Sequence, residues 1–469
     1  MTAISVGELS DIIGGELHGD PREIVSGAVV DSRLVTPGVA FVAITGEQVD
    51  GHDFAGVALG AGAVVAITTR ILPIPCIVVP DPIEALGQWA RWWRNKLAES
   101  GQLSVIAITG SSGKTSTKDL LAAVLQSAGT TVAAHGSLNT EVGVPLSVLA
   151  APLGTRFLVL EMGMRGAGHI RYLCSVASPD IAVITNVGSA HLGVLGSRGA
   201  IAQAKAEILE GLSDSQCAIV PAGEPLISAE LYRTSARVVT FGEGAEADVR
   251  AENVGLDDQA RAHFELVNGQ EKAHVSLAVH GEHFVSNALA VAAVAREVGI
   301  PLDSVAELLS VARIESKWRM EVTTTPSGIT LINDAYNANP ESMRAALKSL
   351  ASMRGEGRTW AVLGEMLELG ADSVEEHDAI GRLAVRLDIS QLICVGAGTR
   401  VMHLGASNEG SWGEESRWVP DAESALAILR SETRRGDVVL VKASRGIGLE
   451  TVAAALSHEA AGAHGGDTA

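Results

Sequence analysis

A glycine-rich segment between a buried strand and a helix most constrains the fold of this chain. Residues 104–108 read Ser-Val-Ile-Ala-Ile, a short, uncharged and β-branched run that is typical of a parallel strand buried on both faces. The sequence Thr-Gly-Ser-Ser-Gly-Lys-Thr follows at residues 109–115, and an apolar helical pattern continues to Leu125. Strand, tight loop and helix in this order indicate an α/β fold built on parallel sheets.

The loop has the residue types of a phosphate-binding turn. Its backbone N–H groups and the positive end of the following helix converge on one point, where Lys114 adds a charge and the Thr115 hydroxyl a ligand for Mg²⁺. Only two residues separate Gly110 from the Gly113–Lys114 pair, whereas the strict P-loop has four. The alternative is an ordinary glycine turn with a solvated lysine. The candidate phosphate ligands are Gly110, Ser111, Ser112, Gly113, Lys114, Thr115 and Ser116.

Length and charge limit the organisation and the partners. The 469 residues predict about three domains, and a net charge of −20 argues against a nucleic-acid partner, which would need a basic surface. The sequence shows neither a signal-peptide pattern nor an apolar run long enough for a membrane span, so we expect a cytoplasmic protein without a membrane partner. The four cysteines are far apart and suggest neither a zinc site nor a disulfide framework.

We expect a small α/β domain over residues 1–82, a central parallel-sheet domain over 83–314, and a doubly wound C-terminal domain over 315–469. In the first domain, polar residues interrupt strands at loop positions that could converge on a diphosphate or a sugar, although turn chemistry explains part of the pattern equally well. These candidates are Ser32, Arg33, Asp50 and His52.

The central domain offers further ligands at strand ends. Glu161 ends a buried strand beside the phosphate loop, where a Mg²⁺ ligand is expected, and His191 lies on the loop after the next strand. Lys205 falls on the inward face of a helix expected over 198–212, where it either snorkels or, as a neutral amine, reacts with carbon dioxide to give a carbamate. Asn287, at the start of an apolar helix, is either a cap or a contact to a base or ribose.

The C-terminal domain begins with a strand over 329–333 that ends in Asp334. Asn339 and Pro340 form an N-cap and first-turn pair for a helix that continues to Met353. Further strands are expected over 359–363, 391–395 and 437–441, each followed by a loop and a helical pattern, which favours a doubly wound sheet with its loops at one edge.

Together these motifs resemble the Mur ligase family, whose members use ATP to join an amino acid or peptide to a UDP-N-acetylmuramoyl acceptor. The resemblance implies that Thr115 and Glu161 hold one Mg²⁺ and that His191 and a carbamylated Lys205 hold a second. The catalytic residues that it implies are Lys114, Glu161, His191 and Lys205. It also implies nucleotide contacts from Asn287, Arg319 and Asp334. The implied substrate contacts are Ser32, Arg33, Asp50, His52, Asn139, Tyr336, Asn337 and Asn339.

Within the family, residues 334–340 and 363–370 resemble the branch that adds D-alanyl-D-alanine to UDP-N-acetylmuramoyl-tripeptide through an acyl phosphate, which would be the last cytoplasmic step in building the peptidoglycan pentapeptide precursor. The alternatives are the sibling ligase that adds the third amino acid and, from another class, a P-loop nucleotide switch. The switch leaves the first and last domains without a role. We expect a monomer.

Overall fold

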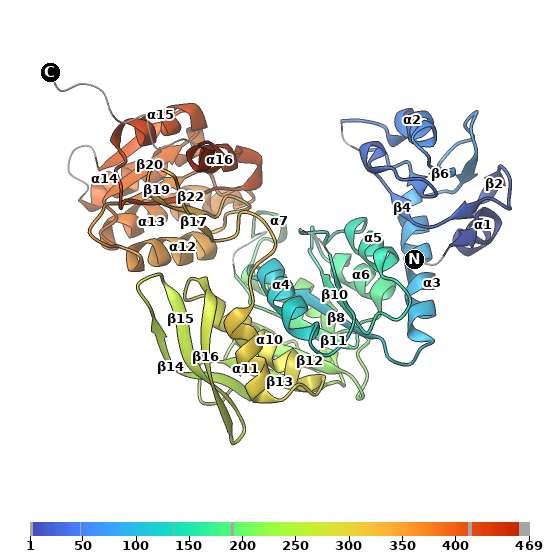
Figure 1. Ribbon diagram of the computed structural model, residues 1–469, viewed down its shortest axis with the longest axis horizontal. Coiled ribbons are helices and arrows are strands. Elements are labelled where there is room, and N and C mark those ends of the chain that lie inside the picture. The colour runs from blue at the N-terminus through green and yellow to red at the C-terminus, as the bar shows by residue number, and fades with distance from the viewer. Residues whose placement is uncertain (1–2, 47, 135, 189–191, 411–414, 459–469) are drawn as a thin grey trace.

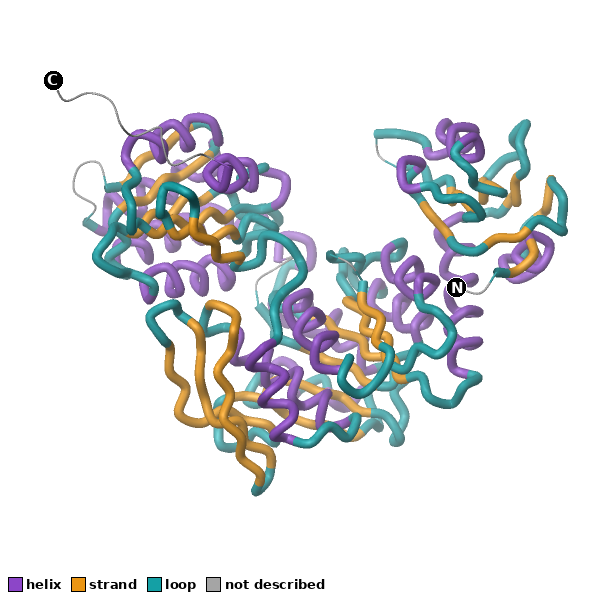
Figure 2. The backbone as a smooth tube through the Cα atoms, in the orientation of Figure 1, coloured by secondary structure: helices purple, strands orange, loops and turns teal. Residues whose placement is uncertain are grey.

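Separate β-sheets, each covered by helices, follow one another along the chain in the computed structural model (Figures 1 and 2). The structure describes residues 3–46, 48–134, 136–188, 192–410 and 415–458. The N-terminal and C-terminal units lie on either side of the central one, which carries the phosphate loop (Figure 1).

The N-terminal sheet has the strand order β2-β7-β6-β5-β4 and is parallel except for the pairing of β2 with β7. A two-stranded ribbon, β1 (Ile4–Ser5) with β3 (Ile24–Val25), lies beside it. The sheet strands are β2 (Glu16–His18), β4 (Ala28–Val29), β5 (Ala40–Val42), β6 (Val65–Thr68) and β7 (Cys76–Val78), and the helices are α1 (Val6–Ile13) and α2 (Ala55–Gly60). Residues 61 and 62 form a turn between α2 and β6, in which Gly62 has φ +114°.

Helix α3 (Pro82–Ala98) connects the N-terminal and central units. The Asp81 carboxylate caps it by accepting from the backbone N–H groups of Ile83 and Glu84, and Pro82 occupies the first turn. Its apolar face carries Trp89 and Trp93, which are fully buried. The helix packs against α1 on one side and against α5 and α6 on the other, so it belongs structurally to both units.

The central sheet has the order β16-β15-β14-β13-β12-β11-β8-β10-β9. Pairings from β9 to β14 are parallel, while β14, β15 and β16 form an antiparallel extension with a hairpin turn at Asn268 and Gly269. The strands are β8 (Ser104–Thr109), β9 (Thr131–Ala133), β10 (Phe157–Glu161), β11 (Ile181–Ile184), β12 (Cys217–Pro221), β13 (Arg237–Gly242), β14 (Val249–Leu256), β15 (Arg261–Asn268) and β16 (Glu271–His280).

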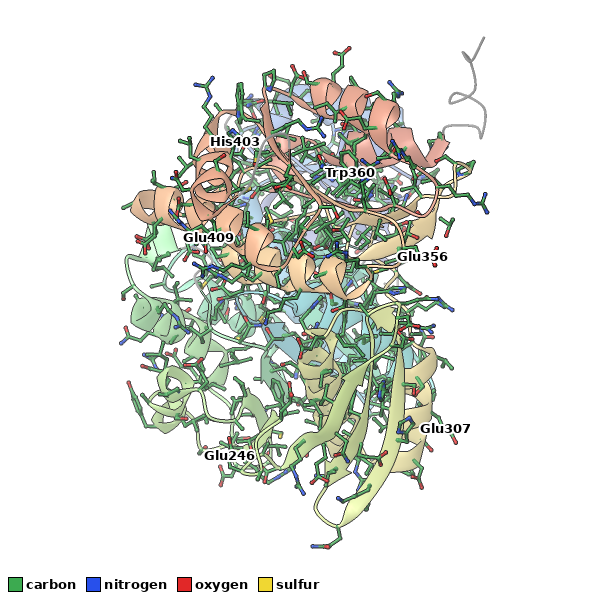
Figure 3. The ribbon with its side chains drawn as sticks, turned by 90° about the vertical axis from the view of Figure 1, so that its left-hand side faces the viewer. Glu246, Glu307, Glu356, Trp360, His403 and Glu409 are labelled. Atoms are coloured by element: carbon green, nitrogen blue, oxygen red, sulfur yellow. The ribbon has the colours of Figure 1, made fainter. Side chains whose placement is uncertain are left out.

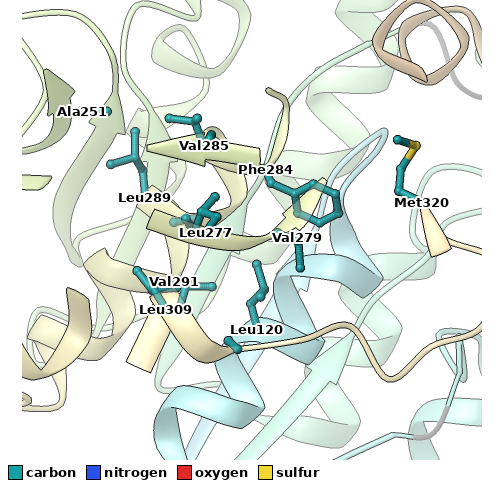
Figure 4. Packing of buried hydrophobic residues seen from close by; sticks show 14 of the residues in the cluster. Leu120, Ala251, Leu277, Val279, Phe284, Val285, Leu289, Val291, Leu309 and Met320 are labelled. Atoms are coloured by element: carbon teal, nitrogen blue, oxygen red, sulfur yellow. The ribbon is translucent and has the colours of Figure 1, made fainter. Parts of the chain in front are cut away.

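Helices cover both faces of this sheet. They are α4 (Lys114–Leu125), α5 (Gly143–Ala150), α6 (His169–Ala177), α7 (Leu192–Leu195), α8 (Arg198–Ala206), α9 (Pro225–Ser228), α10 (Phe284–Glu297) and α11 (Leu302–Val311). Figure 4 shows how Leu120 of α4, Leu277 of β16 and Leu289 of α10 meet in one apolar cluster. Burial of this cluster fixes α4, and therefore the phosphate loop at its start, against the sheet.

The C-terminal sheet has the order β17-β18-β22-β19-β20-β21, with only β17 antiparallel to its neighbour among the described strands. Helices α12, α13 and α14 cover one face, and α15 and α16 the other, which confirms the predicted doubly wound arrangement. The strands are β17 (Glu321–Thr324), β18 (Thr330–Asn333), β19 (Thr359–Leu363), β20 (Gln391–Val395), β21 (Ser416–Val419) and β22 (Val438–Lys442). The helices are α12 (Pro340–Ser352), α13 (Ser373–Arg386), α14 (Arg400–Glu409), α15 (Ala422–Glu432) and α16 (Glu450–His458).

Two helix predictions needed correction. The helix expected over 198–212 ends at Ala206, and residues 207–209 form a single 3₁₀ turn, although Ile201, Ile208 and Leu212 are all buried. Asn287 is not a cap, because α10 begins three residues before it. The predicted cap at Asn339 is confirmed: its side chain accepts from the backbone N–H of Ser342, and Ser342 completes a capping box.

The negative charge lies mainly on the outside. Glu246, Glu307 and Glu356 project from the surface, whereas Trp360 lies inside the C-terminal unit (Figure 3). Among the described residues, no helix is both long and apolar enough to cross a membrane.

Candidate active site

The phosphate loop joins β8 to α4 at the carboxyl edge of the central sheet. Its two glycines are required by space as well as by backbone angle. A Cβ on Gly110 would lie 1.8 Å from Thr185 Oγ1, and a Cβ on Gly113, which has φ +78°, would lie 2.5 Å from Asn287 Oδ1. The short glycine spacing thus brings the loop into direct contact with β11 and α10.

Asn186, directly after β11, braces this loop. Its side-chain oxygen accepts from the backbone N–H groups of Ser111 (3.2 Å) and Ser112 (3.0 Å), and its amide nitrogen donates to Ser112 Oγ (2.9 Å). Thr185 Oγ1 also donates to the Ser112 carbonyl (2.7 Å). The loop is therefore held in shape by a neighbouring strand end.

Glu161, the last residue of β10, lies beside the start of α4. One carboxylate oxygen accepts from Thr115 Oγ1 (2.6 Å), and the other from Ser137 Oγ (2.9 Å) and Asn139 Nδ2 (2.7 Å). Thr115 and Glu161 are each only 1% exposed. A hydroxyl and a carboxylate at the end of a phosphate loop are the hard oxygen donors that Mg²⁺ prefers, so this pair fits the expected metal.

Lys114 and Lys205 lie close enough for their charges to influence each other. Burial lowers the pKa of Lys205 well below its usual value, and the charge of Lys114 lowers it further. Lys205 is 1% exposed, so its side chain does not snorkel to solvent. Burial also lowers the pKa of Lys114, an effect that Arg319 reinforces and Glu161 opposes. The predicted ligand His191 lies outside the described residues.

The C-terminal unit supplies the opposite wall. The Arg319 guanidinium lies 4.2 Å from the centre of the Tyr336 ring, and Asp334 accepts from Lys442 Nζ at 2.6 Å. Lys442 also donates to the Asn337 carbonyl (2.8 Å). Asn339 Nδ2 lies 3.5 Å from the Ser111 carbonyl, so the start of α12 reaches the phosphate loop.

A cavity of about 770 Å³ lies between these two walls and is lined by residues of both. The sequence-predicted residues that line it are Ser111, Ser112, Gly113, Lys114, Thr115, Ser116, Asn139, Glu161, Asn287, Arg319, Asp334, Tyr336, Asn337 and Asn339. Gly110 and Lys205 are not in its lining. Two buried donors, Asn287 Nδ2 and Arg319 Nε, have no hydrogen-bond partner among the described residues. Because buried donors are normally paired, their presence fits a nucleotide in this cavity.

The N-terminal candidates do not line this cavity. Arg33 is exposed and pairs with Asp31 (2.6 Å), whereas His52 is buried. His52 Nδ1 lies 2.5 Å from Asp50 Oδ1, and His52 Nε2 accepts from the Thr69 backbone N–H (3.0 Å). Since both ring nitrogens are engaged, His52 joins two loops of the domain. Ser32 is partly buried at the start of the adjacent 3₁₀ turn.

Several lining residues escaped the sequence prediction. His283 was seen only as part of a loop, yet burial lowers its pKa to about 4, and its Nδ1 has no partner among the described residues. The charge of Asp334 opposes this shift and that of Lys442 adds to it. Asn186 and Lys442 each follow or end a parallel strand, a position that could have identified both. Tyr172 offered no signal, because it lies on the amphipathic helix α6.

Comparisons with known proteins agree with this geometry. Three family models match: Mur ligase family, catalytic domain (residues 25–91), Mur ligase middle domain (108–295), and Mur ligase, glutamate ligase domain (318–445). The UDP-N-acetylmuramoyl-tripeptide–D-alanyl-D-alanine ligase of Mycobacterium tuberculosis is 45% identical over 97% of this chain and 98% of its own length.

Solved structures give the same result. A crystal structure of MurF from Acinetobacter baumannii is 32% identical, covers 98% of this chain and 100% of its own, and superposes with a TM-score of 0.87. The MurF ligase of Thermotoga maritima, solved in complex with ADP, is 29% identical over 92% of this chain and 97% of its own, with a TM-score of 0.79. This chain belongs to the Mur ligase family.

Proposed function

We propose that this chain joins D-alanyl-D-alanine to the terminal carboxylate of UDP-N-acetylmuramoyl-tripeptide with consumption of ATP. The single observation that carries the proposal is the cavity between the phosphate loop and the C-terminal unit, in a chain 45% identical to a relative named for this reaction. Its lining combines a phosphate loop, an oxygen-donor pair and cations from two sheets. This set suits a reaction in which two anionic reactants must meet.

In the proposed reaction, the acceptor carboxylate attacks the γ-phosphorus of ATP, which gives an acyl phosphate and ADP. The amine of D-alanyl-D-alanine then attacks the acyl carbon, and phosphate leaves. Lys114 would neutralise the outer phosphates, and Arg319 would add charge from the other wall. Asn287 would contact the base or ribose, and Asp334 would hold Lys442 in place at the cavity wall.

Thr115 and Glu161 would hold a first Mg²⁺, and His191 with Lys205 a second. A bound Mg²⁺ supplies charge neutralisation between phosphate and carboxylate oxygens. Asn139 and Ser137, which both donate to Glu161, would orient its carboxylate toward the metal. Closure of the C-terminal unit over the nucleotide would exclude water from the acyl phosphate.

Lys205 would act as a carbamate. Its buried, neutral amine attacks carbon dioxide, a nitrogen–carbon bond forms, one proton leaves, and the product is an anion next to Lys114. ¹³C NMR of the protein in ¹³C-bicarbonate should show one carbamate signal that is absent from Lys205→Ala. That variant should lose activity, which bicarbonate should not restore and short carboxylates should. Wild-type turnover in Lys205→Ala would contradict the role.

The N-terminal unit would bind the UDP moiety. Arg33 and Ser32 would contact the diphosphate or sugar from an exposed turn, while Asp50 and His52 would fix the loop between them and Thr69. Tyr336, Asn337 and Asn339 would hold the incoming dipeptide at the start of α12. Because the reaction consumes ATP, we place it in the cytoplasm; a monomeric state stays a prediction.

Product analysis separates this function from that of the sibling ligase. The purified chain is incubated with ATP and Mg²⁺ and either UDP-tripeptide plus D-alanyl-D-alanine or UDP-dipeptide plus a diamino acid. Mass spectrometry should detect the pentapeptide product in the first mixture only. Product in the second mixture alone would overturn the proposal in favour of the sibling.

A further inference from the structure

Two charged residues on the phosphate-loop helix have no place in the chemistry described so far. Lys118 and Asp119 lie one turn after Lys114 on α4 and are only 2% and 7% exposed. Lys118 Nζ lies 2.9 Å from Asp119 Oδ1. Neither residue lines the large cavity. A buried ion pair costs much of its Coulomb gain in desolvation, so its presence calls for a reason beyond stability.

Lys118 holds the loop that supports Glu161. Its ammonium group donates to the carbonyl oxygens of Ala134 and Gly136, the latter at 3.1 Å. The same loop then supplies Ser137 and Asn139, whose side chains donate to one oxygen of Glu161. The lysine therefore fixes, through two backbone carbonyls, the segment that orients the candidate metal ligand.

Asp119 holds the linker to the C-terminal unit. Its Oδ2 accepts from the backbone N–H of Ser316 at 2.9 Å. Ser316 lies between the end of α11 and the start of β17, three residues before Arg319. Beyond Arg319, Met320 is buried in the cluster that also contains Leu120 of α4 (Figure 4). The linker is thus fixed on either side of the arginine that enters the cavity.

We propose that Lys118 and Asp119 are positioning residues that hold two active-site segments from behind the phosphate loop: the 136–139 segment, which orients Glu161, and the 316–320 linker, which places Arg319. The assignment of these two segments to catalysis rests on the proposed function. Through this pair, helix α4 supports both the candidate metal site and the linker between the central and C-terminal units.

Hydrogen exchange of the ligand-free protein tests the two contacts separately. In Lys118→Met, amides of the 136–141 segment should exchange at least tenfold faster. In Asp119→Ala, the Ser316 amide should exchange at least tenfold faster, whereas Asp119→Asn, which keeps an acceptor oxygen, should protect it. The double variant Lys118→Met/Asp119→Asn removes both charges, so it should regain stability, keep the Ser316 amide protected and leave exchange fast in the 136–141 segment.

Val305→Ala is the matched control, because it removes buried apolar volume from α11, outside the site. If this variant, at equal loss of Tm, accelerates exchange in the same two segments, the pair is merely structural and the proposal fails. Wild-type exchange in both segments of Lys118→Met and Asp119→Ala would also overturn it.

Calorimetric binding of ADP with Mg²⁺ gives a second readout that needs no turnover. Lys118→Met should weaken the Mg²⁺-dependent part of binding by about tenfold, as outer-sphere substitutions commonly do. Unchanged Mg²⁺-dependent affinity would contradict the coupling to Glu161. If the wild-type protein made no pentapeptide product while the exchange results held, the proposed function would fail and the positioning role would stand.

Discussion

The carboxyl edges of two parallel sheets face the same cavity but differ in how their charges are satisfied. At the central edge, the hydrogen bond that Lys114 makes within the described residues goes to the carbonyl of Gly110 in its own loop, at 2.9 Å. At the C-terminal edge, Lys442 already pairs with Asp334 at 2.6 Å and is 2% exposed. Lys442 is the last residue of β22, whereas Lys114 begins α4 after the loop that follows β8. Of these two lysines, Lys114 has no carboxylate hydrogen-bonded to its ammonium group among the described residues, so its charge is available for a ligand.

This difference indicates a division of labour. The central edge is built to receive an anion, with loop, lysine and oxygen donors supported by Asn186 and by the Ser137–Asn139 segment. The C-terminal edge holds the neutralised Lys442–Asp334 pair and presents Arg319 and Tyr336 beside it. Because Lys442 and Asp334 already neutralise each other, they can approach and leave a charged complex without a large desolvation cost. The C-terminal unit is therefore suited to closing over a site that the central unit holds.

Replacement of Lys114 should give the largest effect. Lys114→Met removes the lysine charge at the central edge, and we expect about 10³-fold slower pentapeptide formation, or about 4 kcal/mol of lost transition-state stabilisation. Initial rates by mass spectrometry at saturating substrates measure this loss. Lys348→Met, on the exposed face of α12, is the control and should keep wild-type turnover. A loss of less than tenfold in Lys114→Met would remove the distinction between the two edges.

Replacement of Lys442 should act on stability. Lys442→Met leaves the Asp334 carboxylate largely buried without its cation, which should cost about 3 kcal/mol in the free energy of unfolding. The double variant Lys442→Met/Asp334→Asn removes both charges and should recover most of that loss. Urea unfolding measures both values. A double variant as unstable as the single one would show that the edge is not a neutralised pair.

Glu161→Gln should change the metal requirement. The amide keeps the size of the side chain but loses the charge, so we expect the Mg²⁺ concentration for half-maximal rate to rise about 10- to 100-fold, or about 1.4–2.7 kcal/mol. A Mg²⁺ titration at saturating ATP measures this shift, and the exposed Glu246→Gln serves as control. If the titration curve of Glu161→Gln matched that of the wild type, the metal would lie elsewhere.

His283→Gln should have the smallest effect, visible in the pH dependence of stability. The folded protein protonates His283 only near pH 4, whereas the unfolded chain does so near pH 6.5. Between pH 4 and pH 6.5 the unfolded state therefore binds more protons than the folded state. The neutral His283 contributes about 1–2 kcal/mol to the free energy of unfolding, and this contribution is complete above pH 6.5 and is lost as the pH falls toward 4. The free energy of unfolding, measured in urea, should differ less between pH 5 and pH 7.5 in His283→Gln than in the wild type. If the difference were equal in the two proteins, a group other than His283 would bind the proton.

Local patterns predicted the sheets and much of the cavity. Short apolar runs located β8 and β10, because strands buried on both faces tolerate little else. Strand ends then located Glu161 and Asp334, since parallel strands bring their carboxyl ends to one edge. The Asn339–Pro340 pair located the start of α12, because capping is a local interaction.

Non-local contacts escaped the same reasoning. The burial of Lys205 depends on packing between separate segments, so helical periodicity could not distinguish a buried amine from a snorkelling one. The roles of Asn186 and His283 depend on loop shapes set by distant strands. Lys118 donates to the carbonyl of Ala134, 16 positions along the chain, and Asp119 accepts from the N–H of Ser316, 197 positions along the chain. No local sequence pattern encodes contacts at these separations. The sequence thus predicted functional residues on helices and at strand ends better than it predicted the residues whose side chains hold those segments in place.

Phosphate release from ATP tests most directly whether the chain is a ligase whose two sheet edges close on the bound reactants. In such an enzyme, sustained release of phosphate requires every reactant. Release is measured with UDP-tripeptide and D-alanyl-D-alanine added singly and together, in the presence of Mg²⁺. We expect sustained phosphate release only when both substrates are present, in an amount equal to that of the pentapeptide product. Equal release without either substrate would contradict the ligase and favour a nucleotide switch.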